Sequence, residues 1–130
     1  FVSVHVPLNE NTRDFIGMEQ FKEMKSKAYF INVSRGGVIK EKDLIKALKK
    51  GIIRGAALDV FENEPPQQNN PLLEMDNVIL TPHAAALTGE CVVKMATEAA
   101  RRVITVLEGN KPEKIANPEV LSHNKWKHLQ

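Results

Sequence analysis

The sequence predicts an α/β fold built on a parallel β-sheet, and three observations support that prediction. Short runs of apolar and β-branched residues alternate along the chain with segments of helical periodicity. These runs are apolar throughout rather than alternating with polar residues, which is typical of strands covered on both faces. Polar side chains follow several of the runs, where a parallel sheet presents its ligand-binding edge. We therefore expect about four parallel strands with flanking helices and right-handed crossover connections.

The first half of the chain contains two expected strands and two expected helices. Residues 2–6 and 28–33 are apolar runs, the first stopped by a proline, and we interpret both as strands. Residues 18–24 form a short helical stretch. Residues 41–50 form an amphipathic helix, and Gly51 follows it in the position where glycine commonly ends a helix.

The second half adds two more strands and a long helix. Residues 55–60 carry small side chains that permit close packing, and residues 78–80 form the fourth apolar run. Apolar residues recur at helical spacing over residues 88–108, and Gly109 ends that helix. We expect the segment from 111 to 130, which is polar and basic at its end, to lie on the surface.

Composition excludes several classes of protein. The chain has 130 residues, 42% of them hydrophobic and 26% charged, which suits one ordinary globular domain. A net charge of +2 with interleaved signs gives no basic stripe for nucleic acid. No apolar run has membrane-spanning length, and we expect no metal site. Cys91, the only cysteine, rules out an intrachain disulfide framework and fits a reducing, cytoplasmic compartment.

Arg35, Glu64 and His83 are the candidate catalytic residues. Each lies shortly after an apolar run, so a parallel sheet would bring all three to the same edge. The planar guanidinium of Arg35 can form two parallel hydrogen bonds to a carboxylate and keeps its charge. The imidazole of His83 can move a proton near neutral pH, and Glu64 could orient that ring. This combination makes an enzyme the first hypothesis.

Three motifs around these residues carry a family resemblance. They are residues 24–36 (MKSKAYFINVSRG), 55–65 (GAALDVFENEP) and 77–83 (NVILTPH). In order and spacing they resemble the C-terminal half of the NAD-binding domain of D-isomer-specific 2-hydroxyacid dehydrogenases, of the phosphoglycerate dehydrogenase or glyoxylate/hydroxypyruvate reductase type. The resemblance implies the second half of a Rossmann-type doubly wound sheet over residues 1–110, with residues 111–130 as a C-terminal return segment and tail.

The resemblance also implies site roles. Arg35 would bind the carboxylate of a 2-hydroxy or 2-keto acid, His83 would carry the proton, and Glu64 would orient His83. Asp59 would lie beside the nicotinamide, although a capping role in the following turn is the alternative. The positions that resemble cofactor contacts are His5, Val33, Ser34, Arg35, Asp59, His83 and Ala85; a structural role at the end of its strand is the alternative for His5. The cofactor would be NAD, with NADP left open, and the full-length protein would be a homodimer.

The sequence departs from the family pattern at Lys40, where an acidic or small polar residue is usual, and at residues 84–87, which replace an Ile- and Gly-rich run. It also contains no Gly-x-Gly-x-x-Gly turn for a pyrophosphate. We therefore expect a part of a longer dehydrogenase that is inactive alone. The alternatives are an NAD(H)-sensing binding protein that resembles a corepressor, and an inert truncated remnant.

Overall fold

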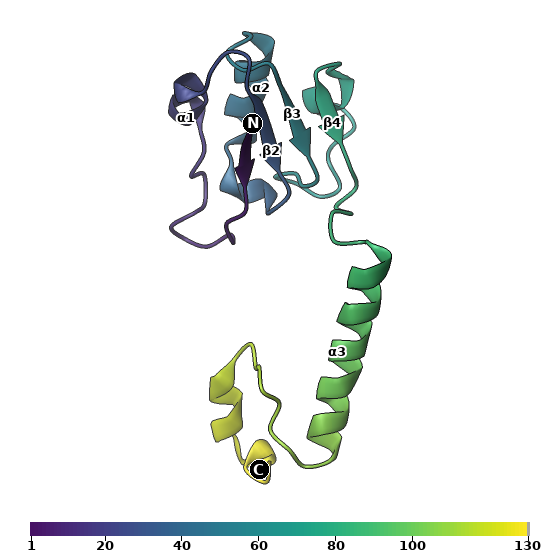
Figure 1. Cartoon of the computed structure of the whole chain (residues 1–130). Helices are drawn as coiled ribbons and strands as arrows, with labels where there is room; N and C mark the ends of the chain where they lie inside the picture. Colours follow the sequence, from purple (N-terminus) through teal and green to yellow (C-terminus); the bar gives the residue numbers. More distant parts are fainter. Residues whose placement is uncertain (130) are drawn as a thin grey trace. The chain divides into compact units, whose positions relative to one another are not determined.

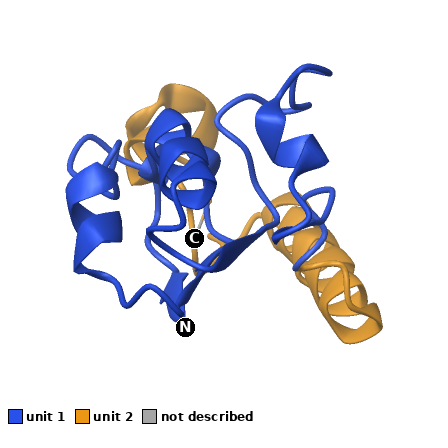
Figure 2. Ribbon diagram, turned by 90° about the horizontal axis from the view of Figure 1, so that it is seen from above, with its two compact units in different colours: residues 1–85 blue, residues 86–130 orange. Residues whose placement is uncertain are grey.

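A computed structural model describes residues 1–129 of the chain. The chain divides into two compact units, one of residues Phe1–Ala85 and one that begins at Ala86 (Figure 2). The candidate catalytic residues all belong to the first unit.

The first unit contains a four-stranded parallel sheet (Figure 1). The strands are β1 (Val2–Val4), β2 (Tyr29–Asn32), β3 (Gly55–Leu58) and β4 (Val78–Leu80), and they pair in that order. All three pairings are parallel. The predicted α/β class with four parallel strands is confirmed, and the carboxyl ends of the strands share one edge of the sheet.

Helices cover one face of the sheet. Phe30 of β2 is fully buried and contacts Phe21 of helix α1 (Met18–Glu23) edge to face, with ring centroids 5.3 Å apart. Helix α2 (Glu41–Lys49) buries Leu44, Ala47 and Leu48 in the same core. The apolar face of α2 makes these contacts, so the helix is held firmly against the sheet.

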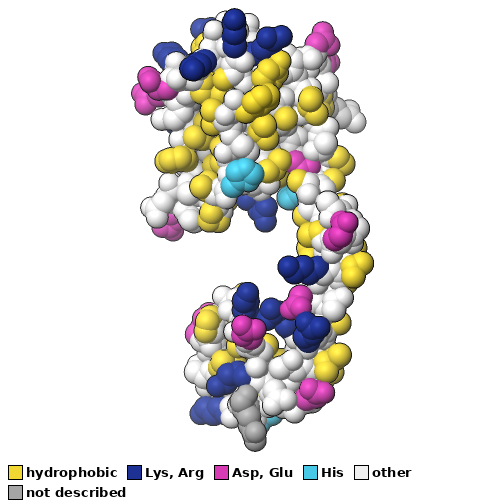
Figure 3. All heavy atoms as spheres, in the orientation of Figure 1, with side chains coloured by type: hydrophobic (Ala, Val, Ile, Leu, Met, Phe, Trp, Pro, Cys, Tyr) yellow, Lys and Arg dark blue, Asp and Glu magenta, His cyan; other side chains and the backbone are white. Residues whose placement is uncertain are grey.

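The opposite face of the sheet is exposed in the first unit. The helices of this unit pack on the other face, so the expectation that both faces of the sheet are covered stays a prediction. Ile79 of β4 keeps 70% of its surface accessible, and Phe1 is exposed while its ring stacks on Tyr29. Figure 3 shows hydrophobic side chains gathered over the strands on this face.

Strand β1 ends at Val4 rather than at residue 6. Val4 pairs with Asn32, the last residue of β2, and beyond Asn32 the chain turns away from the sheet. His5 and Val6 therefore have no neighbouring backbone in β2 with which to continue the ladder.

The second unit contains helix α3 (Gly89–Leu107), with the Thr88 hydroxyl accepting a hydrogen bond from the Cys91 amide at its start. Short 3-10 turns follow at Pro118–Ser122 and Asn124–Trp126. No residue of α3 is buried, and the boundary between the two compact units lies between Ala85 and Ala86. The assignment of residues 1–110 and 111–130 to parts of a larger domain stays a prediction. None of the helices in residues 1–129 has the length and hydropathy needed to cross a membrane.

Candidate active site

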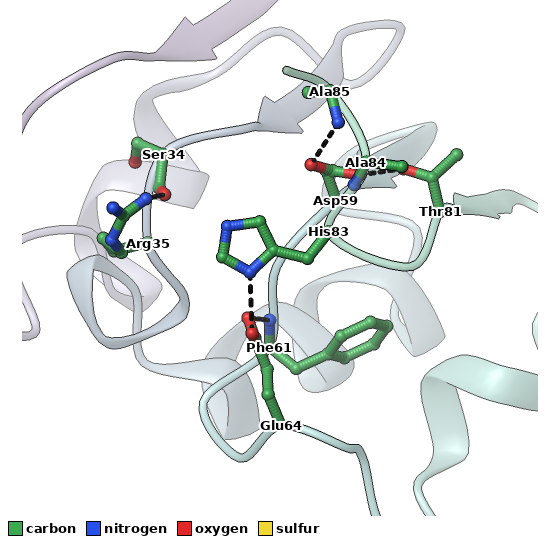
Figure 4. Close-up of polar contacts among 9 residues, drawn as sticks. All are labelled: Ser34, Arg35, Asp59, Phe61, Glu64, Thr81, His83, Ala84 and Ala85. Atoms are coloured by element: carbon green, nitrogen blue, oxygen red, sulfur yellow. Dashed lines mark hydrogen bonds and ion pairs between the residues drawn. The ribbon is translucent and has the colours of Figure 1, made fainter. Parts of the chain in front are cut away.

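The candidate site lies where three strands end. Ser34 and Arg35 follow β2, Asp59 directly follows β3, and His83 comes after β4. Because the strands are parallel, these residues share one edge of the sheet. The sequence predicted this for Arg35 and His83, whereas Asp59 fell inside the expected strand of residues 55–60, and the observed strand ends at Leu58. Figure 4 shows their side chains and the contacts among them.

Asn32 shapes the turn that carries Arg35. Its side chain is fully buried; the amide nitrogen donates to the carbonyl oxygen of Arg35 (3.1 Å), and the amide oxygen accepts from the Ser34 amide (3.0 Å) and hydroxyl (2.9 Å). A buried amide with all these partners fixes the backbone around it. The Arg35 side chain itself is exposed, with Nη1 donating to the Ser34 carbonyl oxygen at 2.7 Å.

Gly36 allows two site loops to touch. A Cβ atom built at this position would lie 1.8 Å from the carbonyl oxygen of Phe61 and 2.0 Å from its carbonyl carbon. The turn that carries Arg35 and the segment that leads to Glu64 therefore meet backbone to backbone, which is possible only for glycine. This contact brings a cation and a carboxylate from different strands into one site.

Glu64 and His83 form a hydrogen-bonded pair. Oε2 of Glu64 lies 2.8 Å from Nδ1 of His83, while Oε1 accepts from the Phe61 amide at 3.0 Å. The hydrogen bonds from His83 and from Phe61, together with the charges of His83 and Arg35, hold the pKa of Glu64 below its ordinary value despite partial burial. An ionised carboxylate accepts only, so Nδ1 must be the protonated nitrogen. The other ring nitrogen faces the space toward Ser34 and Arg35 (Figure 4).

Asp59 holds the turn that carries His83. Its Oδ1 accepts from the Thr81 hydroxyl (2.5 Å) and the Ala84 amide (2.8 Å), and its Oδ2 accepts from the Ala85 amide (2.9 Å). Burial raises the pKa of this carboxyl, but the three hydrogen bonds and the nearby His83 outweigh burial, so the pKa lies below its ordinary value. His83 has a φ of 54°, in the left-handed region, and such a backbone persists when its surroundings fix it.

Other predicted contacts lie at the same edge or near it. Val33 and Ala85 are exposed beside Ser34 and His83. His5 is exposed just past β1, where its Nε2 lies 2.7 Å from the Ser3 hydroxyl. The roles of these residues stay predictions.

A cavity of about 170 Å³ adjoins the Glu64–His83 pair and is lined largely by Phe61, Pro65, Pro66 and Pro82. Within residues 1–129, no group of three or more His, Cys, Asp or Glu side chains is placed to hold a metal ion.

Sequence reasoning missed Asn32 and the clamping geometry of Asp59. A polar amide that closes an otherwise apolar run was the available signal for Asn32, because a buried polar group must find partners. The partners of Asp59 lie 22–26 residues away, so no local pattern revealed them.

Comparison with known proteins gives consistent matches. A family model described as "D-isomer specific 2-hydroxyacid dehydrogenase, NAD binding domain" matches residues 1–85. The chain is 51% identical over 120 residues to a glyoxylate reductase of Thermofilum pendens, covering 92% of this chain and 35% of that protein. It is 50% identical over 117 residues to a D-3-phosphoglycerate dehydrogenase of Methanocaldococcus jannaschii, covering 90% and 22%.

A solved structure matches the fold. The D-isomer specific 2-hydroxyacid dehydrogenase from Lactobacillus delbrueckii ssp. bulgaricus, in its NAD complexed form, superposes with a TM-score of 0.81 at 36% identity, over 88% of this chain and 39% of that one. The chain thus spans about a third or less of the length of the two curated relatives.

Proposed function

The chain belongs to the D-isomer specific 2-hydroxyacid dehydrogenase family, and on that premise we propose that its site serves hydride transfer between a nicotinamide cofactor and a D-2-hydroxy acid or its 2-keto acid. The observation that carries the proposal is the Glu64–His83 hydrogen bond at an edge that also presents Arg35. A proton carrier with a fixed tautomer, placed near a fixed cation, suits the reduction of a carbonyl that lies next to a carboxylate.

The residues present fit the nicotinamide end of NAD. The exposed apolar side chains of Val33 and Ala85 offer a surface for a flat ring, and Ser34 adds a hydroxyl. Asp59 has little accessible surface, and three donors from the 81–85 turn already bind its carboxylate, which leaves room for one further donor such as a carboxamide. The hydride itself would come from, or return to, the nicotinamide ring. The same proposal takes NAD as the cofactor, with NADP as the competitor to be tested.

Arg35 would hold the substrate. Its guanidinium can donate two parallel hydrogen bonds to the carboxylate, and its charge would stabilise the oxygen that becomes negative during reduction. Asn32 fixes the backbone of Arg35, while the exposed side chain leaves its guanidinium free to turn toward the substrate carboxylate.

His83 would carry the proton. In reduction the ring acts as the imidazolium, and the nitrogen that does not face Glu64 donates its proton to the developing alkoxide; in oxidation the neutral ring accepts the hydroxyl proton at the same nitrogen. Glu64 keeps Nδ1 protonated and stabilises the imidazolium, as the acid of a Ser-His-Asp triad does for its histidine.

The remaining expectations belong to this proposal as well. They are a small 2-keto or 2-hydroxy acid as partner, a homodimer in the full-length protein, and a cytoplasmic location. An NAD(H)-sensing role, similar to that of a corepressor, is the alternative that the assay below must exclude; the intact Arg35, Glu64 and His83 set favours catalysis over sensing. An inert remnant is the third outcome.

A chimera tests the proposal. The chain replaces the matching 120 residues of the Thermofilum pendens glyoxylate reductase, and oxidation of NADH and NADPH is followed with glyoxylate and other 2-keto acids. We expect turnover that His83→Asn lowers by about 10²- to 10⁴-fold, the usual contribution of general acid catalysis. Arg35→Lys should raise KM for the keto acid, because a lysine lacks the planar fork.

Arg101→Lys is the matched control, since Arg101 belongs to the second unit and pairs with Glu98 of its own helix, α3. A chimera that binds NADH but reduces none of the keto acids would favour the sensing role. A chimera that folds and does neither would favour the inert remnant.

A further inference from the structure

The loop of residues 62–70, which we call the Glu64 loop, carries one of the three candidate catalytic side chains. It begins after the buried Phe61 and ends before the buried Leu72, and between these two anchors nearly all its residues are exposed. An exposed loop of this length would ordinarily be mobile, yet Glu64 must meet His83 at hydrogen-bond distance.

Glu41 connects both ends of the Glu64 loop. Its Oε2 accepts from the Glu62 amide at 2.9 Å, and its Oε1 accepts from the Asn70 side-chain nitrogen at 2.8 Å. Asn70 in turn accepts from the Leu72 amide at 3.0 Å through its side-chain oxygen. One carboxylate therefore fixes the first and the last residue of the loop.

Two successive backbone amides link the two Glu41 contacts, which we call the Glu41 clamp, to the site. The Phe61 amide donates to Glu64, and the next amide, that of Glu62, donates to Glu41. The orientation of one peptide unit constrains the next, because the backbone has only two soft dihedrals per residue. The bond to Glu41 thus helps to aim the amide that holds the Glu64 carboxylate.

Glu41 is itself well anchored. It is the first residue of α2, whose buried Leu44, Ala47 and Leu48 fix the helix in the core. A negative charge in the first turn of a helix is also favourable to the helix dipole. Glu41 therefore ties the exposed Glu64 loop to a helix that is anchored in the core.

We propose that Glu41 is a positioning residue of the site: by tying both ends of the Glu64 loop to helix α2, it holds Glu64 against His83. The inference rests on the proposed function, because positioning matters only if the Glu64–His83 pair handles a proton. Glu41 would then affect the reaction through Glu64, without touching substrate or cofactor itself.

The test measures the Glu64 carboxyl directly. The pKa of Glu64 in the 130-residue chain is followed by ¹³C NMR titration, and the His83 tautomer by ¹⁵N shifts. In Glu41→Ala the pKa of Glu64 should rise toward its ordinary value, since the bonds that lower it depend on the loop. Glu41→Gln should have a smaller effect, because its one oxygen can still accept from the Glu62 amide.

A reciprocal swap separates the clamp from a simple charge effect. Glu41→Gln combined with Asn70→Asp lets the new amide donate to the new carboxylate, so both contacts are restored with the total charge unchanged. This double variant should return the Glu64 titration to that of the wild type. Glu62→Gln is the matched control, because it removes one negative charge from the same loop while leaving both Glu41 contacts in place.

The outcomes are distinct. A folded Glu41→Ala chain whose Glu64 titrates as in the wild type would overturn the inference, as would a swap that rescues nothing or a Glu62→Gln variant with an equal effect. In the chimera, Glu41→Ala should lower kcat by about tenfold, part of the usual effect of a general acid, with KM for the keto acid nearly unchanged. An inactive wild-type chimera would refute the proposed function, while the NMR titration would still decide the role of Glu41.

Discussion

Replacement of Gly36 by alanine should separate the two loops that build the site. The added Cβ would lie 1.8 Å from the Phe61 carbonyl oxygen and 2.6 Å from the Glu62 nitrogen, and both neighbours are backbone atoms. Because close-packed interiors do not yield freely, one loop must move by about 1.5 Å before ordinary contact is restored. The movement would carry Phe61, and with it the amide that holds Glu64, away from the Arg35 turn.

The energetic cost follows from the same geometry. Overpacking usually costs about 1–3 kcal/mol, and a clash between two backbones belongs at the upper end, about 3 kcal/mol. For a unit of 85 residues each kcal/mol lowers Tm by about 4–8 °C, so we expect a loss of about 12 °C or more. Differential scanning calorimetry or thermal circular dichroism measures this shift.

Gly37→Ala is the matched control for Gly36→Ala. The Cβ at Gly37 would meet the ends of the Leu8 and Arg13 side chains at 3.1–3.4 Å, and flexible side chains can give way. Its Tm should change by only a few degrees, at about 0.5 kcal/mol. If the two variants unfold at the same temperature and the Glu64 titration is the same in both, the backbone contact does not hold the site together.

Three further outcomes are expected. The pKa values of Glu64 and Asp59 lie below their ordinary values, so the stability they contribute is present at neutral pH and is lost as the pH falls through those lowered values; urea unfolding at a series of pH values should show this loss, with a weaker pH dependence in Asp59→Asn. The 130-residue chain should bind NADH more weakly than micromolar, because its sequence has no Gly-rich pyrophosphate turn, and a calorimetric titration that gives micromolar affinity would contradict this. The outer edge of β1 should promote self-association that Val2→Lys reduces, whereas sedimentation velocity showing a concentration-independent monomer would count against it.

The sequence was most informative where a property is local. Apolar runs located the four strands, and the ends of those runs located Arg35 and His83 at one edge, because parallel strands all end on the same side. Helical periodicity gave α2 to within one residue of its observed end. Strands β1 and β3 were each overestimated by two residues, and the end of β1 depends on where its partner β2 turns and not on its own residues.

Contacts between distant residues could not be predicted in this way. Glu41 meets Asn70 across 29 positions, and Asp59 meets Ala85 across 26. The left-handed backbone of His83 was equally hidden, because no glycine or asparagine marks the position.

A common principle connects the three candidate catalytic side chains. Each of them is exposed, and exposed side chains on loops would lose too much conformational freedom to meet a substrate in one geometry. Each is nevertheless supported by a polar residue on or directly beside a regular element: Asn32 at the end of β2 for Arg35, Asp59 after β3 for His83, and Glu41 on α2 for Glu64. The ends of the strands thus decide where the site lies, and these three hydrogen-bonding residues hold the backbone segments that carry its side chains. Loss of one of them should therefore impair the geometry of a single catalytic group, even though none of the three candidate catalytic residues has been changed.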